Sequence, residues 1–396
     1  MTDRHLLAMH HSEVQVSVEL ETPDVTLSLG PQHPSTHGVL RLVAKVDGEV
    51  INSVDPVIGY MHRGYEKLAE VRTYPQITAL VNRIDWVSGF ANEVPFMVAL
   101  ERLMGLEVPM RAQYIRLVLT EMARISSHLV FLSSYPLELG AATPLMHALR
   151  ERERVLDLIE GVTGGRFHPN FNRIGGVKPA AGAGSNQKKV RQDLPEGFLD
   201  QSRDAMRNVL AVCDDMVDLV VGNEIFLERT KGVGVIPADR ALEFGVSGPN
   251  LRGSGVRFDI RKTDDYLPYS RFDFDVPTGA NGDCFDRYMV RFEEIRQAAR
   301  IVIQACDTMP AGELQAKVPR VIKVPRGEVY VRAENPKGEM GYYVVSEGGR
   351  GPYRLKIRSA SFSNISILPW LLEGQLVPDI IAILGSLDFV LGDVDR

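Results

Sequence analysis

The chain has 396 residues, which at about 150 residues per domain is enough for two or three packed units. Apolar residues make up 44% and charged residues 24%, which excludes a disordered or collagen-like chain. The 45 Lys and Arg residues against 51 Asp and Glu residues give a formal net charge of -6, which disfavours nucleic acid or an anionic bilayer as the partner.

Strand-like alternation of apolar residues marks the beginning of the chain. It occurs at residues 14–18 and again at residues 40–46, where it ends at the turn signal Asp47-Gly48. A further run follows at residues 49–54. These patterns predict a small antiparallel sheet over roughly residues 12–60.

From about residue 65 to residue 309 the apolar period becomes helical. The clearest stripe runs from Ile115 to Leu132 along one face of a predicted bundle helix. A second helix is predicted with Thr143 as its N-cap, Pro144 as its first residue and Gly164-Gly165 at its end. Two more are predicted over Phe198–Val221 and Asp283–Thr308. The centre of the chain is therefore predicted to be a helical bundle.

Short strands return near the end of the chain, at residues 329–332, 342–345 and 355–357, before an apolar segment at residues 380–384. Small residues and three cations at residues 180–191 predict an exposed, mobile loop.

We divide the chain into three regions. Residues 1–63 form an N-terminal β-rich region with the GPQHPSTHG loop, residues 64–320 the central helical bundle, and residues 321–396 the C-terminal strands and helix. We find no internal repeat.

The three cysteines, Cys213, Cys284 and Cys306, form no C-x-x-C pair and no disulfide framework, which fits a reducing compartment. No export signal begins the chain, and no apolar run approaches the roughly 18 to 20 residues that span a bilayer. We therefore expect a chain that is neither exported nor transmembrane, although a surface patch could still seat it on a membrane protein.

The loop Gly30–Gly38 contains His33 and His37 at a spacing that zinc-binding helices use. Pro31 and Pro34 forbid a regular helix there, so a metal site is not expected. The loop is either a turn whose imidazoles are satisfied locally, or a rigid support that holds a titratable imidazole in a cavity. The residues alone leave both interpretations open.

Two other polar motifs carry candidate residues. Arg63 lies just before a predicted helix, a position typical of the surface. Arg83 and Asp85 come just before Trp86, one of only two tryptophans, and a buried indole N–H normally seeks such a polar partner, so core packing is the favoured interpretation. The glycine-rich stretch Ser247–Asp259 lacks the features of a P-loop or a dinucleotide site. No G-x-S-x-G elbow of a serine hydrolase is present.

Several long motifs occur in a fixed order. They are GPQHPSTHGVLRL at residues 30–42, IGYMHRGYEKLAE at 58–70, RIGGVK at 173–178, LRGSGVRFDIRK at 251–262, GDCFDRYMVR at 282–291 and the terminal GDVDR. With them the chain, from about residue 26 to 396, closely resembles the D subunit of proton-translocating NADH:quinone oxidoreductase, respiratory complex I.

The resemblance implies an α+β fold. Its centre would be a helical bundle of the nickel-iron hydrogenase large-subunit type, with a small N-terminal antiparallel β-sheet region and a short C-terminal α/β region. Hydrogenases hold their metal with two C-x-x-C motifs, and this chain has neither. The resemblance therefore implies that the emptied metal cavity forms part of a quinone pocket, with no metal bound.

The resemblance also implies partners. Quinone would be the substrate, and no cofactor would be bound by this chain alone, since the iron–sulfur clusters, FMN and NADH belong to partner subunits. The expected neighbours are the iron–sulfur cluster (B) subunit, the C subunit, the ferredoxin-like I subunit and the membrane-embedded H subunit. The chain would lie peripherally on the cytoplasmic face of the cell (inner) membrane, where quinone reduction drives proton translocation.

Carried over position by position, the resemblance implies that His37 donates a hydrogen bond or a proton to the quinone headgroup. Glu138 would pair with His37, while Arg63 and His168 would lie near the partner's cluster. Trp86 would line the pocket, and the remaining motif residues assigned to the binding site are His33, Arg83 and Asp85.

Two departures from the family's pattern affect this chemistry. Trp86 stands where the family typically has Tyr, and an indole N–H donates a hydrogen bond but is not a practical acid. Glu138 replaces an Asp, which keeps the charge and adds a methylene. Residues 180–191 also look inserted, and the segment before Gly327 shortened.

Two rival hypotheses belong to other classes. One is a hydrogenase-type metalloenzyme, which the missing cysteine pairs oppose. The other is a structural member of a divergent or partial complex with reduced quinone chemistry or a non-NADH electron donor, which Trp86 and Glu138 favour.

Overall fold

The computed structural model describes residues 25–32, 38–178 and 194–396. The predicted strand at residues 14–18, the loop residues His33 and His37, and the predicted loop at 180–191 lie outside the described residues. The described part is a mixed helix and strand fold, as the resemblance implies.

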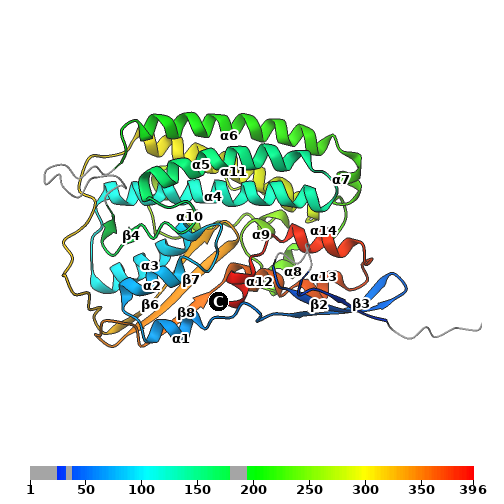
Figure 1. The fold of residues 1–396 in the computed structure, drawn as a ribbon, viewed down its shortest axis with the longest axis horizontal. Coiled ribbons are helices and arrows are strands. Elements are labelled where there is room, and N and C mark those ends of the chain that lie inside the picture. The colour runs from blue at the N-terminus through cyan, green and yellow to red at the C-terminus, as the bar shows by residue number, and fades with distance from the viewer. Residues whose placement is uncertain (1–24, 33–37, 179–193) are drawn as a thin grey trace, which may run out of the picture.

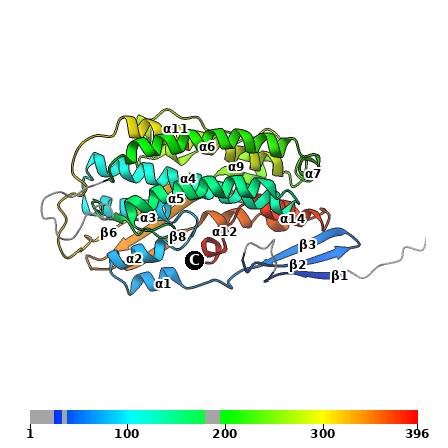
Figure 2. The ribbon, with the colours of Figure 1, turned by 45° about the horizontal axis from the view of Figure 1, so that its top comes forward.

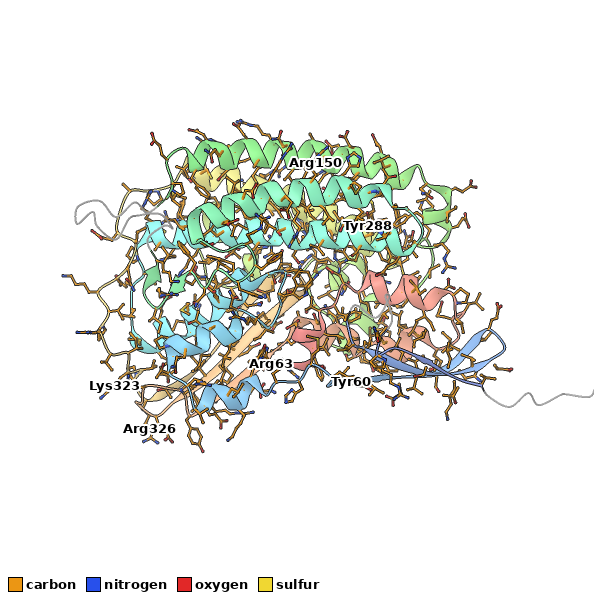
Figure 3. All side chains as sticks on the ribbon, viewed as in Figure 1. Tyr60, Arg63, Arg150, Tyr288, Lys323 and Arg326 are labelled. Carbon is orange, nitrogen blue, oxygen red and sulfur yellow. The ribbon has the colours of Figure 1, made fainter. Side chains whose placement is uncertain are left out.

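Long helices pack side by side along one layer of the molecule (Figure 1). They are α4 (Met110–Glu138), α5 (Thr143–Thr163), α6 (Phe198–Val221) and α11 (Cys284–Asp307). The predicted stripe on α4 is fully buried, and Tyr288 of α11 lies inside the bundle (Figure 3). The helical centre predicted from the 3.6-residue period is confirmed.

The expected N-cap of α5 is wrong by one residue. Thr143 is the first helical residue, and Ala142 occupies the cap position without a side-chain hydrogen bond. The helix has already turned at Ala142, which adopts right-handed helical angles, so the hydroxyl of Thr143 comes too late to cap it. The predicted end at Gly164 is confirmed, because its φ of 79° is a left-handed angle that glycine adopts without strain.

The N-terminal sheet consists of β1 (Val25–Leu29), β2 (Arg41–Asp47) and β3 (Val50–Val57), paired antiparallel in that order. The alternating side chains of β2 point into the core, as predicted. The sequence patterns did not indicate β1. Along β3, Ile51 exchanges backbone hydrogen bonds with Gln375 and Gly374, so the end of the chain extends this region.

A second antiparallel sheet contains β6 (Gly327–Asn335), β7 (Gly338–Ser346) and β8 (Arg354–Arg358), which confirms the three predicted strands. Helix α3 (Gly89–Met104) packs against β6 and β7 on one side and α4 on the other. It therefore joins the sheet to the bundle, and almost all of its residues are buried.

The remaining elements are shorter. They are α1 (Tyr65–Glu70), α2 (Tyr74–Val81), β4 (Asn172–Arg173), β5 (Gly176–Val177), α7 (Glu224–Glu228), α8 (Ala238–Glu243), α9 (Pro249–Gly253), α10 (Ile260–Thr263), η2 (Tyr269–Arg271), α12 (Ala360–Ile365), α13 (Leu368–Leu372), α14 (Asp379–Ser386) and α15 (Leu391–Asp395). Within the described ranges, none of the helices is both long enough and apolar enough to cross a membrane.

Fully buried charges join the bundle to the second sheet. Arg252 of α9 contacts Glu294 of α11 at 2.6 Å and Glu334 of β6 at 2.9 Å. Arg261 of α10 likewise contacts Glu121 of α4 at 3.0 Å. The glycine-rich stretch that showed no nucleotide motif therefore supplies Arg252 to a structural ion-pair network.

Removing one cation from this network should destabilise the fold. We expect Arg252→Met to lower the free energy of unfolding by about 3–5 kcal/mol, because two carboxylates stay buried without their partner. Chemical denaturation of the purified full chain measures this. The matched control is Arg207→Met, which removes an exposed pair with Asp204 at 2.8 Å and should cost at most about 1 kcal/mol. Equal costs for the two variants would contradict the prediction.

Candidate functional site

Three segments far apart in the sequence meet at the C-terminus. Figure 2 shows the end of the chain between α1 and the N-terminal sheet. Asp395 accepts hydrogen bonds from the backbone N–H groups of Gly59, at 2.8 Å, and Met61, at 2.7 Å. On the other side, Gly392 approaches the carbonyl of Ile84 so closely that a Cβ would lie 2.8 Å from that oxygen. The last residues therefore connect the loop before α1 with the turn after α2.

Asp85 forms the buried floor of that turn. Its carboxylate accepts hydrogen bonds from the Ser88 hydroxyl and from the backbone N–H of Val87. Burial, aided by the nearby charge of Asp393, raises the pKa of Asp85 to about 6, against the opposing effect of Lys337 and these hydrogen bonds. Lys337 is itself buried and pairs with Asp388. Asp85 is thus a carboxyl that changes charge within reach of neutral pH.

The expectation that Trp86 packs in the core is wrong. Its side chain is 48% exposed. The hydrogen bonds of Asp85 hold that side chain inward, and the next side chain along the turn consequently faces outward. The indole lies 6.2 Å from the ring of Phe167, which is also exposed, beside a cavity of only about 20 Å³. Trp86 is therefore available to a neighbouring molecule.

His168 lies on the loop between α5 and β4 and is half-buried. Its ring Nδ1 is 2.9 Å from the side-chain oxygen of Asn82. Burial lowers the pKa of His168, and the positive charge of Arg83 lowers it further. The structure therefore places Arg83 within electrostatic range of His168.

Arg63 lies elsewhere. It is exposed, its guanidinium is 6.0 Å from the ring centre of Tyr65, and Figure 3 shows it beside Tyr60 on the edge opposite Arg150 of α5. Gly64, with a φ of 64°, lets the chain turn into α1 directly after it. In the described part of the chain no contact joins Arg63 to His168. The neighbouring His62 lines a cavity of about 390 Å³ next to Asp395 and Arg396.

The predicted pair of His37 and Glu138 is only half visible, since His37 lies outside the described residues. Glu138 ends α4 half-buried, and its Oε2 lies 2.7 Å from where a Cβ of Gly385 would stand. Gly38, which directly follows the histidine loop, approaches Leu391 in the same way, at 3.3 Å. The end of that loop and Glu138 thus both contact the segment from α14 to α15.

Several polar residues of this site escaped the sequence patterns. Glu93 and Lys337 are fully buried, as are Asp388 and Asp393. Glu93 carried a recognisable signal, because it interrupts the apolar run of α3, where an unpartnered carboxylate would be costly.

The described residues offer no converging ligand set for a metal. In the ranges that the structure describes, no three His, Cys, Asp or Glu side chains are grouped so that they could hold an ion. All three cysteines are buried, and burial raises the pKa of Cys213 and of Cys306 to about 12. Burial therefore keeps these two thiols protonated at neutral pH.

Comparison with known proteins gives one consistent family. The model of the family described as respiratory-chain NADH dehydrogenase, 49 kDa subunit, matches residues 138–322 and 317–396. A protein named as the D subunit of NADH-quinone oxidoreductase, from Carboxydothermus hydrogenoformans, is 48% identical over 95% of this chain and 100% of its own length. A protein of the same name from Geobacillus thermodenitrificans is 47% identical over 95% of this chain and 100% of its own length. Another, from Methylacidiphilum infernorum, is 45% identical over 93% of this chain and 91% of its own length.

The buried carboxyl of Asp85 predicts a pH dependence of stability. Its pKa is about 6 in the folded chain, whereas the ordinary value, expected in the unfolded chain, is 3.8. The folded state therefore binds the proton more tightly, and the free energy of unfolding should fall as the pH rises from about 4 to 6. We expect this loss of stability with rising pH to be smaller in Asp85→Asn, by up to about 3 kcal/mol. Free energies of unfolding measured across this pH range test it, and identical slopes for both proteins would contradict it.

Proposed function

This chain belongs to the family of the 49 kDa subunit of respiratory-chain NADH dehydrogenase, and we propose that it forms the quinone-reduction site beside an iron–sulfur cluster of a partner subunit. The resemblance drawn from the motifs is confirmed by relatives that cover nearly the whole chain. The chain is accordingly part of an NADH:quinone oxidoreductase and is active within the multisubunit enzyme.

The observation that carries the proposal is the grouping of Arg83, Trp86 and His168 at the surface around buried Asp85. One turn carries the permanent cation of Arg83 and the hydrogen-bond donor of Trp86, and one loop carries the titratable imidazole of His168. A fixed positive charge stabilises a reduced, more negative cluster, and an imidazole takes up a proton when the electron arrives. This grouping supports a cluster-facing role for Arg83 and His168 and gives Arg63 no part in it.

The quinone side of the site rests on His37 and Glu138. Quinone takes two electrons from the cluster and two protons to become quinol. His37 would donate a hydrogen bond or a proton to the headgroup, with Glu138 stabilising the charged imidazole. The contact of Glu138 with Gly385 of α14, and that of Gly38 with Leu391 of α15, support the assignment of Glu138 to this part of the molecule. His33, Arg83 and Asp85 complete the binding residues of the proposal.

The partners follow from the same proposal. The iron–sulfur cluster (B) subunit would present the cluster, with the C subunit, the ferredoxin-like I subunit and the membrane-embedded H subunit as further neighbours. FMN, NADH and the clusters would be held by partner chains. The assembly would lie on the cytoplasmic face of the cell (inner) membrane and would couple electron transfer to proton translocation.

A second candidate is a structural role in a divergent or partial complex with weakened quinone chemistry or another electron donor. The replacement of the family's Tyr by Trp86 favours it, because the indole cannot serve as the proton source. Quinone reductase activity of the purified complex distinguishes the two candidates.

Separate replacement of Arg83 and of Arg63 tests the cluster-facing role proposed for Arg83 and His168. We expect Arg83→Met to lower the reduction potential of the neighbouring cluster by on the order of tens of millivolts, because a nearby cation is lost. His168→Met should flatten the pH dependence of that potential. Arg63→Met is the matched control and should change neither quantity. Redox titration of the assembled complexes at several pH values gives the answer, and an effect of Arg63→Met alone would reverse the assignment.

The quinone role of His37 is tested by His37→Ala. Losing one preorganised donor should reduce quinone turnover by a factor of about 100 to 1,000, while the complex assembles and its clusters still reduce. Steady-state quinone reduction and spectroscopy of the clusters measure the two parts. Near-normal turnover would exclude His37 as the principal donor.

Trp86→Tyr tests the place where this chain departs from its family. The phenol restores a group that can donate both a hydrogen bond and a proton, so quinone turnover should be unchanged or higher. An assembled but inactive Trp86→Tyr complex would mean that the pocket is shaped around the indole, and the family's chemistry could not then be carried over to this position.

A further inference from the structure

Glu93 connects the two segments that surround His168. This residue of α3 is completely buried. Its Oε1 accepts a hydrogen bond from the side-chain amide of Asn82 at 2.6 Å, and its Oε2 accepts two from Asn172, one from the backbone N–H and one from the side chain, each at 3.0 Å. Asn82 directly follows α2, and Asn172 follows the loop that carries His168.

The orientation of the Asn82 amide follows from this contact. A carboxylate only accepts hydrogen bonds, so the NH₂ group of Asn82 must face Glu93. The amide oxygen must then face the imidazole, 2.9 Å from Nδ1 of His168. Because that oxygen can only accept, Nδ1 must carry a proton in both the neutral and the charged ring.

We propose that Glu93 is a positioning residue that fixes, through the amide of Asn82, which ring nitrogen of His168 gains and loses the proton. While Glu93 is ionised, Nδ1 keeps its proton, and Nε2 is the nitrogen that titrates. This inference rests on the proposed function in so far as it names the group that controls the proton-responsive imidazole of the site.

A carboxylate is needed because both of its oxygens accept hydrogen bonds. A Gln at position 93 would place an NH₂ group against either Asn172 or Asn82. If it kept its oxygen toward the two donors of Asn172, its NH₂ group would face Asn82 and force that amide to turn over. The NH₂ group of Asn82 would then face Nδ1 of His168, which could only accept, and the neutral ring would carry its proton on Nε2.

Packing leaves the two segments little freedom to avoid this coupling. At Gly89 a Cβ would lie 2.8 Å from the Asn82 carbonyl and 3.0 Å from the Phe167 carbonyl. The backbones on both sides of His168 therefore press against the first turn of α3. A change in the hydrogen-bonding character of Glu93 is therefore answered more readily by the rotation of an amide than by a shift of these closely packed backbones.

Among the described residues, few charged or titratable groups surround this chain of contacts. Arg83 acts on His168, while Arg173, Lys178 and Tyr342 interact with Glu93. Burial raises the pKa of Glu93 to about 7, against its hydrogen bonds and Arg173. Protonating Glu93 would remove an acceptor as the Gln substitution does, so Glu93 and His168 compete for protons.

Nitrogen NMR of the full chain with ¹⁵N-labelled histidine rings tests the proposal directly. The chain has nine histidines, and His168→Gln identifies the signal of His168. In the wild type we expect neutral His168 to carry its proton on Nδ1. In Glu93→Gln the proton should move to Nε2, and the pKa of His168 should fall by about one to two units, because the charged ring loses an acceptor.

Glu101→Gln is the matched control. Glu101 is another buried carboxylate of the same helix, but it pairs with Arg116, at 2.6 Å, and does not contact Asn82. It should leave the His168 signal unchanged. Glu93→Asp retains a carboxylate and should keep the proton on Nδ1. If Glu93→Gln does not fold, the wild-type spectrum still decides, since a neutral His168 protonated on Nε2 overturns the proposal. A Glu93→Gln spectrum identical to the wild type overturns it too.

A second measurement separates this inference from the proposed function. In the assembled complex, the cluster potential of Glu93→Gln should lose its pH dependence at a lower pH than the wild type does. If the NMR signals change as expected while the potential is unaffected at every pH, the inference stands and the cluster-facing role of His168 fails. If the NMR signals do not change, the inference fails whatever the potential shows.

Discussion

The site depends on the contact between Asp395, the next-to-last residue, and the loop before α1. Its carboxylate accepts hydrogen bonds from two backbone N–H groups, of Gly59 and Met61, that lie outside the strands and helices, and hydrogen bonds to a charged acceptor are among the stronger ones. The same short helix presses Gly392 against Ile84, where a side chain would not fit. The turn with Arg83 and Trp86 and the loop with Arg63 are therefore held by residues 392–395, which lie far from both in the sequence.

Two pairs of buried carboxyls differ in their partners. Glu121 and Glu294, between the bundle and the second sheet, face arginines, and these cations lower their pKa despite burial. Asp85 and Glu93 are held mainly by amide and hydroxyl donors, and burial raises their pKa to about 6 and about 7. The first pair keeps its charge and serves structure, while the second pair changes charge near neutral pH.

Local patterns predicted most of the fold because helix and strand periods are set by neighbours in sequence. The bounds of α6 were predicted correctly for that reason, and the three C-terminal strands were predicted in the right places but too short. The site was harder, because exposure and partnership depend on contacts across the chain. Nothing beside Trp86 reveals that Asp85 takes the buried position of the turn, and no spacing indicates that Arg83 rather than Arg63 lies near His168. Glu93 alone left a trace, as an acid within an apolar helix.

The partner of His168 explains how its imidazole is oriented and yet left free to change its charge. A carboxylate in direct contact would stabilise the charged ring and hold it protonated across the physiological range. Asn82 is neutral, so it orients the ring without fixing its charge, and burial together with Arg83 keeps the pKa below its ordinary value. Arg83 keeps its positive charge at every physiological pH, whereas His168 can gain or lose a proton. Placing Glu93 one amide further away lets a carboxylate set the geometry of the imidazole while leaving its proton exchangeable.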